Sequence, residues 1–565
     1  MASPQFPEPP PTITPTTLEE CDALVARVSA NKEAWLKVGI PKRVEYLQAV
    51  IDGMNAVAAD MVADGCRAKG IDPSSPQAGE EWLGTVTTTV RNARLLIEAL
   101  QANGQPKAPR ISERADGQKV AHVFPASLQD KLMFTGFTAE VWLEPGKPAT
   151  QGRIYREPQT EGSCCMVLGA GNVGSISPMD ALHKLFVENE VVVLKMNPVN
   201  EHTGPHIEKA FKGLVDDGFF AVTYGGVEVG KHLTSHPQVD SLHVTGSDRT
   251  YDAIVWGGDP AEREARKSTG ERINTRPFTA ELGCVTPVMV VPGPWSSSDI
   301  EYQARSIAGM VTQNGSFNCN AAKVVVVARG WAQRDEFLQA LRRALTEAAP
   351  RKAYYPGAQQ RYEAFLSQYP RAEKLGEQGE SIVPWTFIPD VEDDAGEYAL
   401  SNEAFCGVLA HVDLNCSTAS EFLRQATDFA NDRCWGTLSC MLIVHPKSAK
   451  EAPEALDRAL AELRYGGIAV NCWAGIIYGL VVTSWGAFPG HTPEDIRSGV
   501  GVVHNSYLFD HPQKSIVKAP FKIQPAPFWW PAHKNLSGLG KKMVAMESSP
   551  GWGKLVGVAM EAFKG

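Results

Sequence analysis

The sequence lacks the cysteine patterns of metal sites and of disulfide frameworks. It has no C-x-x-C pair and no closely spaced set of cysteine and histidine, and its 11 cysteines are an odd number spread along the chain. Structural zinc sites and secreted disulfide-rich domains both need regular, short spacings. The sequence therefore predicts no metal site, a cytoplasmic location and at most one or two chemically special thiols.

Long apolar runs and clusters of basic residues are missing as well. The nearest candidate for a membrane span, residues 472–488, is interrupted by glycine, serine and threonine, and the chain does not open with a basic region followed by an apolar stretch. A span or a secretory signal needs such segments. The net charge of -10 also disfavours nucleic acid as a partner. We expect no membrane span, no nucleic-acid partner and a small molecule as the ligand.

The chain of 565 residues exceeds what one hydrophobic core supports, and its pattern changes along its length. Residues 3–16 are too rich in proline to fold alone, which predicts a flexible or surface-draped Pro-rich arm over residues 1–17. Apolar residues then recur at helical spacing to about residue 102, and β-prone runs broken by glycine and proline follow at about 118–157.

Strand-like and helix-like segments alternate in two later regions. In the first, apolar runs ending at Leu168, Lys195, Tyr224 and Gly246 alternate with helical patterns, and a second alternation covers about residues 285–487. Such alternation is typical of parallel α/β sheets. The sequence thus predicts two α/β domains.

Residues 169–174 carry three glycines in the order G-x-G-x-x-G, directly after an apolar run. In a dinucleotide-binding motif the glycine loop opens directly onto a helix, and an acidic residue follows about 20 positions later. Here Ser177 is the expected N-cap, so the helix starts three residues after the last glycine, and the next strand ends in Lys195. We therefore expect a tight strand-to-helix turn, in which Asn172 can donate a hydrogen bond into a cleft.

Five stretches carry a resemblance to a known family. They are, in chain order, VVVLKMNP ending at Pro198, HVTGSDRT at 243–250, TAELGCVTP at 279–287, QNGSFNCNAAKVVVV at 313–327 and NEAFCGV at 402–408. In this order and spacing they resemble the NAD(P)-dependent aldehyde dehydrogenase superfamily, over roughly residues 20–515.

The resemblance implies an α/β, aldehyde dehydrogenase-like fold with two doubly wound (Rossmann-like) α/β domains and a small β oligomerisation flap. The expected parts are a nucleotide-binding domain at 18–130 and 158–284, the flap at 131–157 and 500–521, a catalytic domain at 285–499 and a C-terminal extension at 522–565. The flap implies a homodimer or homotetramer.

The resemblance also assigns roles to single residues. Cys319 matches the nucleophile, Glu281 the general base and Asn172 the oxyanion donor. It implies NAD or NADP as the cofactor. The positions that match the cofactor-binding residues are Lys195, Gly226, Gly246, Ser247, Glu403 and Phe405.

These residue types suit the oxidation of an aldehyde to its carboxylic acid. A thiolate adds to the aldehyde carbon, an amide stabilises the oxyanion, and a carboxylate activates the water that hydrolyses the thioester. Family members that pass the acyl group to coenzyme A generally lack the glutamate that Glu281 matches. Two alternatives stay open: a coenzyme A-dependent acylating aldehyde dehydrogenase or acyl-CoA reductase, and an inactive scaffold with the same fold.

Several positions depart from the family pattern. Gly171 replaces the usual aromatic residue and Phe317 the usual glutamine, which indicates a roomy, apolar tunnel for larger aldehydes. Ala181 stands where many hydrolytic members have a proton-relaying lysine, and His183 and Lys184 are the candidate substitutes.

Two further features bear on the cofactor. Pro198 stands three residues after Lys195, where a glutamate would repel a 2′-phosphate, so the sequence predicts use of NADP as well as NAD. Residues 257–275 are rich in charge and form an extra segment, which predicts a surface insertion near the cofactor.

Overall fold

The structure is a computed structural model that describes residues 6–157 and 159–565. Its N-terminal part is helical, as the apolar spacing predicts. The helices are α1 (Leu18–Ala30), α2 (Lys32–Leu36), α3 (Ile40–Ala68) and α5 (Thr88–Gln101), with a π-helical segment (Trp82–Thr87) before α5. A capping box between Thr17 and Glu20 fixes the start of α1. Helix α1 packs on strands β5 and β6.

A six-stranded sheet forms one half of the molecule, in the order β17-β8-β7-β4-β5-β6. Its parallel strands are β4 (Cys164–Leu168), β5 (Val191–Lys195), β6 (Phe220–Thr223), β7 (Ser241–Gly246) and β8 (Phe278–Leu282), and β17 (Gly499–Val500) is antiparallel to β8. The first predicted α/β alternation is therefore confirmed. The carboxyl ends of these strands meet at one edge, where ligands bind in open α/β sheets.

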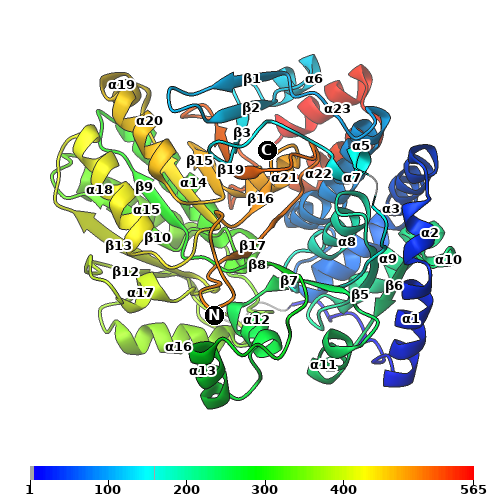
Figure 1. The fold of residues 1–565 in the computed structure, drawn as a ribbon. Helices are drawn as coiled ribbons and strands as arrows, with labels where there is room; N and C mark the ends of the chain where they lie inside the picture. The colour runs from blue at the N-terminus through cyan, green and yellow to red at the C-terminus, as the bar shows by residue number, and fades with distance from the viewer. Residues whose placement is uncertain (1–5, 158) are drawn as a thin grey trace.

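An eleven-stranded sheet forms the other half (Figure 1). Its parallel centre contains β9 (Pro287–Val290), β10 (Val324–Ala328), β12 (Thr386–Ile388), β13 (Val408–Leu414), β14 (Ser439–Ile443) and β15 (Gly467–Val470). Helices α14 (Ser297–Thr312), α15 (Arg334–Glu347), α18 (Ala419–Asp432) and α20 (Pro453–Glu462) connect these strands. The second predicted alternation is thus confirmed.

The antiparallel end of this sheet corresponds to the predicted flap. Strand β19 (Pro512–Lys518) pairs with β15 and with β3 (Thr138–Leu143), and β2 (Lys119–Phe124) and β1 (Arg110–Glu113) follow outward. Strand β2 pairs with β3 and β1 pairs with β2, so both belong to this sheet, although the prediction groups residues 110–124 with the nucleotide-binding part. Cross-strand pairing, which the local pattern does not encode, decides which sheet they join. The domain limits themselves stay a prediction.

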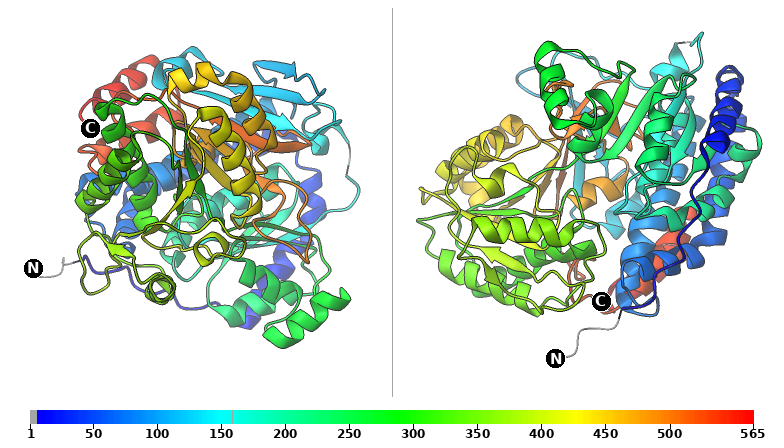
Figure 2. Two further views of the ribbon diagram at one scale, coloured as in Figure 1. Left: turned by 90° about the vertical axis from the view of Figure 1, so that its left-hand side faces the viewer. Right: turned by 90° about the horizontal axis from the view of Figure 1, so that it is seen from below.

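Two segments lie outside the sheets. The charged insertion forms α13 (Pro260–Thr269), which begins at an Asp259 cap and projects from the surface (Figure 2). The C-terminal extension forms α22 (Leu536–Ser548) and α23 (Trp552–Ala562), and these lie against the N-terminal helices and α6 (Leu128–Met133). No helix of the described chain is long and apolar enough to cross a membrane.

Candidate functional site

The three predicted catalytic residues come together from three loops or strand ends. Cys319 lies in the segment before β10, and Glu281 lies near the end of β8. The Cys319 thiol donates a hydrogen bond to Oε1 of Glu281 over 3.4 Å. Asn172, between β4 and α8 (Ile176–Phe186), donates from its side-chain amide to the Phe317 carbonyl over 2.9 Å. All three line the same cavity.

Burial controls the proton affinities of Glu281 and Cys319. Glu281 is 3% exposed, and loss of water together with the charge of Asp180 raises its pKa to about 7. Burial, with the neighbouring Glu281 carboxylate, also raises the pKa of the Cys319 thiol well above its ordinary value. Near pH 7 Cys319 therefore carries its proton, and Glu281 is a suitable acceptor for it.

The loop before Cys319 has an unusual backbone. Asn314 and Ser316 adopt positive φ angles of 54° and 70°, and Gly315 between them has a φ of 66°. Such angles are strained for residues other than glycine and persist where the surroundings hold them. The Asn314 amide supplies that support, because it bonds the Phe317 carbonyl at 3.3 Å and the Asn318 side chain at 3.0 Å. Asn314 is not among the site residues predicted from the sequence.

The main chain at Asn172 is held by three donors. Its backbone carbonyl accepts hydrogen bonds from Lys69 at 2.8 Å, from Asn314 at 3.0 Å and from the Tyr354 hydroxyl at 3.2 Å. Lys69 is itself paired with Glu81 at 2.6 Å. The loop that presents the Asn172 amide is thereby tied to the N-terminal helices and to the segment before Cys319.

The three glycines of this loop serve close packing. A Cβ on Gly169 would collide with Ser177, one on Gly171 would lie 2.8 Å from the Asn197 side chain, and one on Gly174 would lie 2.6 Å from Thr85. This agrees with the predicted tight turn. The helix begins earlier than predicted, at Ile176 with Ser175 at the N-cap position, so Ser177 lies in its first turn.

Lys323 is a central residue of the site that the sequence did not reveal. Its ammonium donates to the carbonyls of Asn318 and Cys319, both at 3.1 Å, and forms an ion pair with Glu403 at 3.1 Å. It is 4% exposed. Only the fold brings it near Glu403, which lies 80 residues later in the sequence. Lys323 fixes the carbonyl of the predicted nucleophile and holds the Glu403 carboxylate.

Phe405 lies in a cluster of aromatic rings. Its ring centre is 5.0 Å from that of Tyr355 and 5.9 Å from that of Phe317, and the Arg361 guanidinium lies 5.7 Å from it. Arg361 also donates to the Phe405 carbonyl at 3.1 Å. Phe405 has a positive φ of 42° and remains partly exposed.

The other predicted cofactor residues lie at the carboxyl edge of the six-stranded sheet. Lys195 ends β5, Gly246 ends β7, and Gly226 and Ser247 precede α11 (Val227–Ser235) and α12 (Asp248–Val255). Burial lowers the pKa of Lys195 to about 8, and the salt bridges within the described residues do not include it. A buried cation near Glu201, at the edge of the sheet where α11 and α12 begin, fits a ligand with hydroxyl and phosphate groups. Space is also available, because a Cβ on Gly226 would meet nothing within 4 Å.

The candidate proton-relay residues do not reach Glu281. His183 and Lys184 both point to Glu188, at 3.1 Å and 2.5 Å, because they lie one turn nearer the C-terminal end of α8 than Asp180 does. That suggestion from the sequence is therefore wrong. The acidic neighbour of Glu281 on α8 is Asp180, which accepts a hydrogen bond from Thr245 at 2.8 Å.

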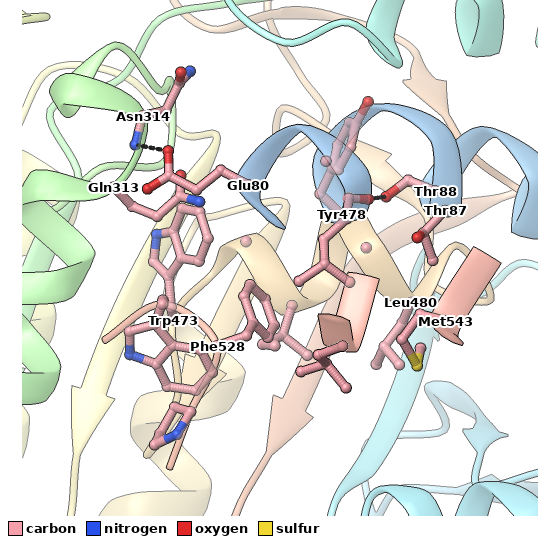
Figure 3. Close-up of a pocket in the computed structure, with 18 of the residues that line it drawn as sticks. Glu80, Thr87, Thr88, Gln313, Asn314, Trp473, Tyr478, Leu480, Phe528 and Met543 are labelled. Atoms are coloured by element: carbon pink, nitrogen blue, oxygen red, sulfur yellow. Dashed lines mark hydrogen bonds between the residues drawn. The ribbon is translucent and has the colours of Figure 1, made fainter. Parts of the chain in front are cut away.

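The apolar cavity exists, but not for the predicted reason. Gly171 packs on Asn197, and Phe317 is 2% exposed among the aromatic rings, so neither lines the cavity. The cavity has a volume of about 270 Å³. Figure 3 shows Gln313 and Asn314 at one side of it and Leu480 and Met543 at the other.

With this geometry in place, comparison with known proteins identifies the family. The family model described as the aldehyde dehydrogenase family matches residues 3–358. The chain therefore belongs to the aldehyde dehydrogenase family. One curated relative, 4-trimethylaminobutyraldehyde dehydrogenase from Oryzias latipes, is 28% identical over 138 residues, and the match spans 24% of this chain and 24% of that relative.

Solved structures show the same fold at low identity. The aldehyde dehydrogenase KauB from Pseudomonas aeruginosa has a TM-score of 0.62 at 16% identity, and the match covers 89% of this chain and 90% of that one. The Mycobacterium tuberculosis aldehyde dehydrogenase complexed with NAD+ has a TM-score of 0.60 at 16% identity, with 91% and 92% covered. The NADP-dependent glyceraldehyde-3-phosphate dehydrogenase from Bacillus halodurans C-125, complexed with NADP, has a TM-score of 0.61 at 15% identity, with 89% and 92% covered. The fold prediction is confirmed.

Proposed function

We propose that this chain oxidises aldehydes to carboxylic acids through a covalent intermediate on Cys319, with NAD or NADP as the hydride acceptor. The observation that supports the proposal most directly is the hydrogen bond from the Cys319 thiol to Glu281 within a cavity that Asn172 also lines. Family membership and the arrangement of Lys195, Gly226 and Gly246 at the sheet edge add further support.

Glu281, Cys319 and Asn172 each act in a different step of the proposed reaction. Glu281 takes the Cys319 proton, and the thiolate sulfur forms a bond to the aldehyde carbon while the carbonyl electron pair moves onto oxygen. The Asn172 amide and the Cys319 backbone N–H stabilise this oxyanion. When bound, NAD(P)+ accepts the hydride. Loss of the hydride leaves a thioester on Cys319, and Glu281 releases the thiol proton to solvent. Glu281 then removes a proton from the water that attacks the thioester carbon and returns it to the departing sulfur of Cys319, which leaves the carboxylic acid as product.

Appearance of NAD(P)H with a panel of aldehydes tests this function. The wild type should reduce the nucleotide only when aldehyde is present, and Cys319→Ala should abolish turnover but retain nucleotide binding. A wild type without activity across the panel would favour the inactive scaffold. Production of aldehyde from an acyl-coenzyme A and NADH, without hydrolytic turnover, would favour the acylating alternative.

We propose that the protein uses both NAD and NADP. Lys195 is a buried cation that tolerates a 2′-phosphate, and Pro198 places no negative charge against it. Initial rates with NAD and NADP at equal concentration test this, since strict use of NAD would contradict it. Lys195→Met should weaken the binding of NADP more than the binding of NAD, because only NADP carries the 2′-phosphate.

We also propose a homodimer or homotetramer that assembles through the flap, in the cytoplasm. Strand β1 is the outer edge of the eleven-stranded sheet, and such an edge offers unpaired backbone groups to another chain. Light scattering coupled to size-exclusion chromatography tests the assembly. A monomer at micromolar concentration would contradict it.

A further inference from the structure

The C-terminal extension contributes a wall of the cavity that contains Cys319. Its lining residues are almost all apolar and come from a proline-rich strap and from both terminal helices: Ile523, Pro527, Phe528, Leu539, Met543 and Val558. Figure 3 shows Phe528 and Met543 directed into the cavity with Trp473 and Leu480 of the catalytic half. The cavity wall therefore includes side chains from the region 523–562.

The strap of this wall is fixed in place. A Cβ on Gly309 of α14 would collide with the Trp529 carbonyl, so the strap lies directly on that helix. The Trp529 indole donates to Ser306 at 3.1 Å, and the Ile523 backbone N–H donates to the Tyr302 hydroxyl at 2.7 Å. These bonds hold the lining residues of the strap in one arrangement.

The terminal helices are held as firmly. A Cβ on Gly540 of α22 would collide with Trp82, and Glu547 at the end of α22 forms buried ion pairs with Arg91 at 2.7 Å and Arg94 at 2.6 Å. Breaking such a buried pair leaves an uncompensated charge and is strongly destabilising. The extension is therefore a preformed part of the cavity.

Apart from Glu281 beside Cys319, each charged side chain that lines the cavity pairs with a group of opposite charge. Lys69 pairs with Glu81 at 2.6 Å, Arg91 pairs with Glu547 at 2.7 Å, and Glu80 pairs with Arg351 at 2.9 Å. Lys69 and Arg91 are the cations of the lining, and both are satisfied. A substrate with a second charge, such as a carboxylate or phosphate, would enter without a counterion and lose its hydration.

We propose that the C-terminal extension builds a substrate-binding tunnel that selects elongated, uncharged, apolar aldehydes. This inference rests on the proposed function, because it takes Cys319 as the attacking group. Apolar walls bind each added methylene of a chain by removing it from water. The expected result is a kcat/KM that rises about threefold to fourfold per methylene from propanal upward, until the cavity is filled.

The matching test compares straight-chain aldehydes with analogues of the same length that end in a carboxylate. The wild type should prefer the uncharged compound by about a hundredfold or more, since the tunnel supplies no free cation. Equal rates with the two series, or kcat/KM values independent of chain length, would overturn the inference. Oxidation of the series without a chain-length effect would leave the proposed function standing, whereas the absence of oxidation of every aldehyde in the series would contradict that function itself.

Substitutions in α22 and α23 test whether these helices form a wall of the tunnel. Met543→Trp and Val558→Trp place a large ring inside the tunnel and should lower kcat/KM for dodecanal about tenfold or more, with propanal changed less than about twofold. Val556→Trp is the matched control, because Val556 is 60% exposed on the outer face of α23 and should change neither rate. Unchanged dodecanal rates in both tunnel variants would contradict the proposal. If either variant fails to fold, the wild-type series still decides it.

Discussion

The Cys319 thiol and the Glu281 carboxylate are hydrogen-bonded over 3.4 Å, although Cys319 precedes a strand of one sheet and Glu281 ends a strand of the other. The contact places a thiol and a buried carboxylate at the junction of the two halves. Burial makes Glu281 a stronger base than an exposed carboxylate, because water no longer stabilises its charged form.

The first prediction concerns pH. Glu281 accepts a proton only when ionised, so kcat/KM should fall as pH drops through its pKa of about 7. Rates measured from acid to mildly alkaline pH should show this limb, and Glu281→Gln should remove it together with most of the activity. Glu271→Gln, which changes an exposed residue next to the insertion helix, is the control and should leave the profile unaltered. A wild-type profile flat between pH 5 and 8 would contradict the assignment.

A second prediction concerns Asp180. Its buried negative charge raises the pKa of Glu281, while Thr245 donates to its carboxylate at 2.8 Å. Asp180→Asn removes the charge and keeps an acceptor for Thr245, so the acidic limb should move to lower pH. The measurement is the apparent pKa of kcat/KM in parallel with the wild type. A limb that stays in place, or moves upward, would show that Asp180 does not act on Glu281.

Removal of the oxyanion donor gives a third prediction. Asn172→Ala should lower kcat by about 10²–10³-fold, because a lost donor leaves the developing negative charge without a partner. Nucleotide binding should change little, since the predicted nucleotide-binding residues lie on other loops. Isothermal titration with NAD and steady-state rates separate these effects. A decrease in kcat of less than about threefold would exclude Asn172 as the oxyanion donor.

Lys323 provides a prediction about stability. Lys323→Met leaves the partly buried Glu403 carboxylate without its ion pair, so the free energy of unfolding in urea should fall by about 3 kcal/mol. Lys212→Met removes an exposed i,i+4 pair with Asp216 and should change stability by less than about 0.5 kcal/mol. Similar losses in the two variants would show that burial of the Lys323 pair has little weight.

The sequence predicted those parts of the fold that follow from local pattern. The runs ending at Leu168 and Lys195 became neighbouring strands, because their apolar residues are buried on both faces of a parallel sheet. The assignments of Cys319, Glu281 and Asn172 rested on short motifs, and the structure brings these three side chains to one cavity. Their catalytic roles remain predictions.

Other features depend on contacts between distant parts of the chain. Lys323 meets Glu403 and Asn172 meets Lys69 only after the two halves and the N-terminal helices have packed, so no local spacing reveals them. His183 and Lys184 were misjudged because they lie one turn farther along α8 than Asp180, where Glu188 after the end of the helix takes both side chains. The apolar lining of the cavity likewise comes from several distant segments, the C-terminal extension among them, and not from Gly171 or Phe317.

Mass spectrometry of the acylated protein tests the central claim most directly. Glu281→Gln should form the thioester slowly, because no carboxylate takes the thiol proton, and hydrolyse it more slowly still, so prolonged incubation with NAD and an aldehyde should leave an acyl group on the peptide that contains Cys319. The wild type should show little adduct at steady state, and Cys319→Ala none. Turnover by the wild type with no acyl group ever found on Cys319 in the glutamine variant, or with the acyl group on another cysteine, would contradict the account.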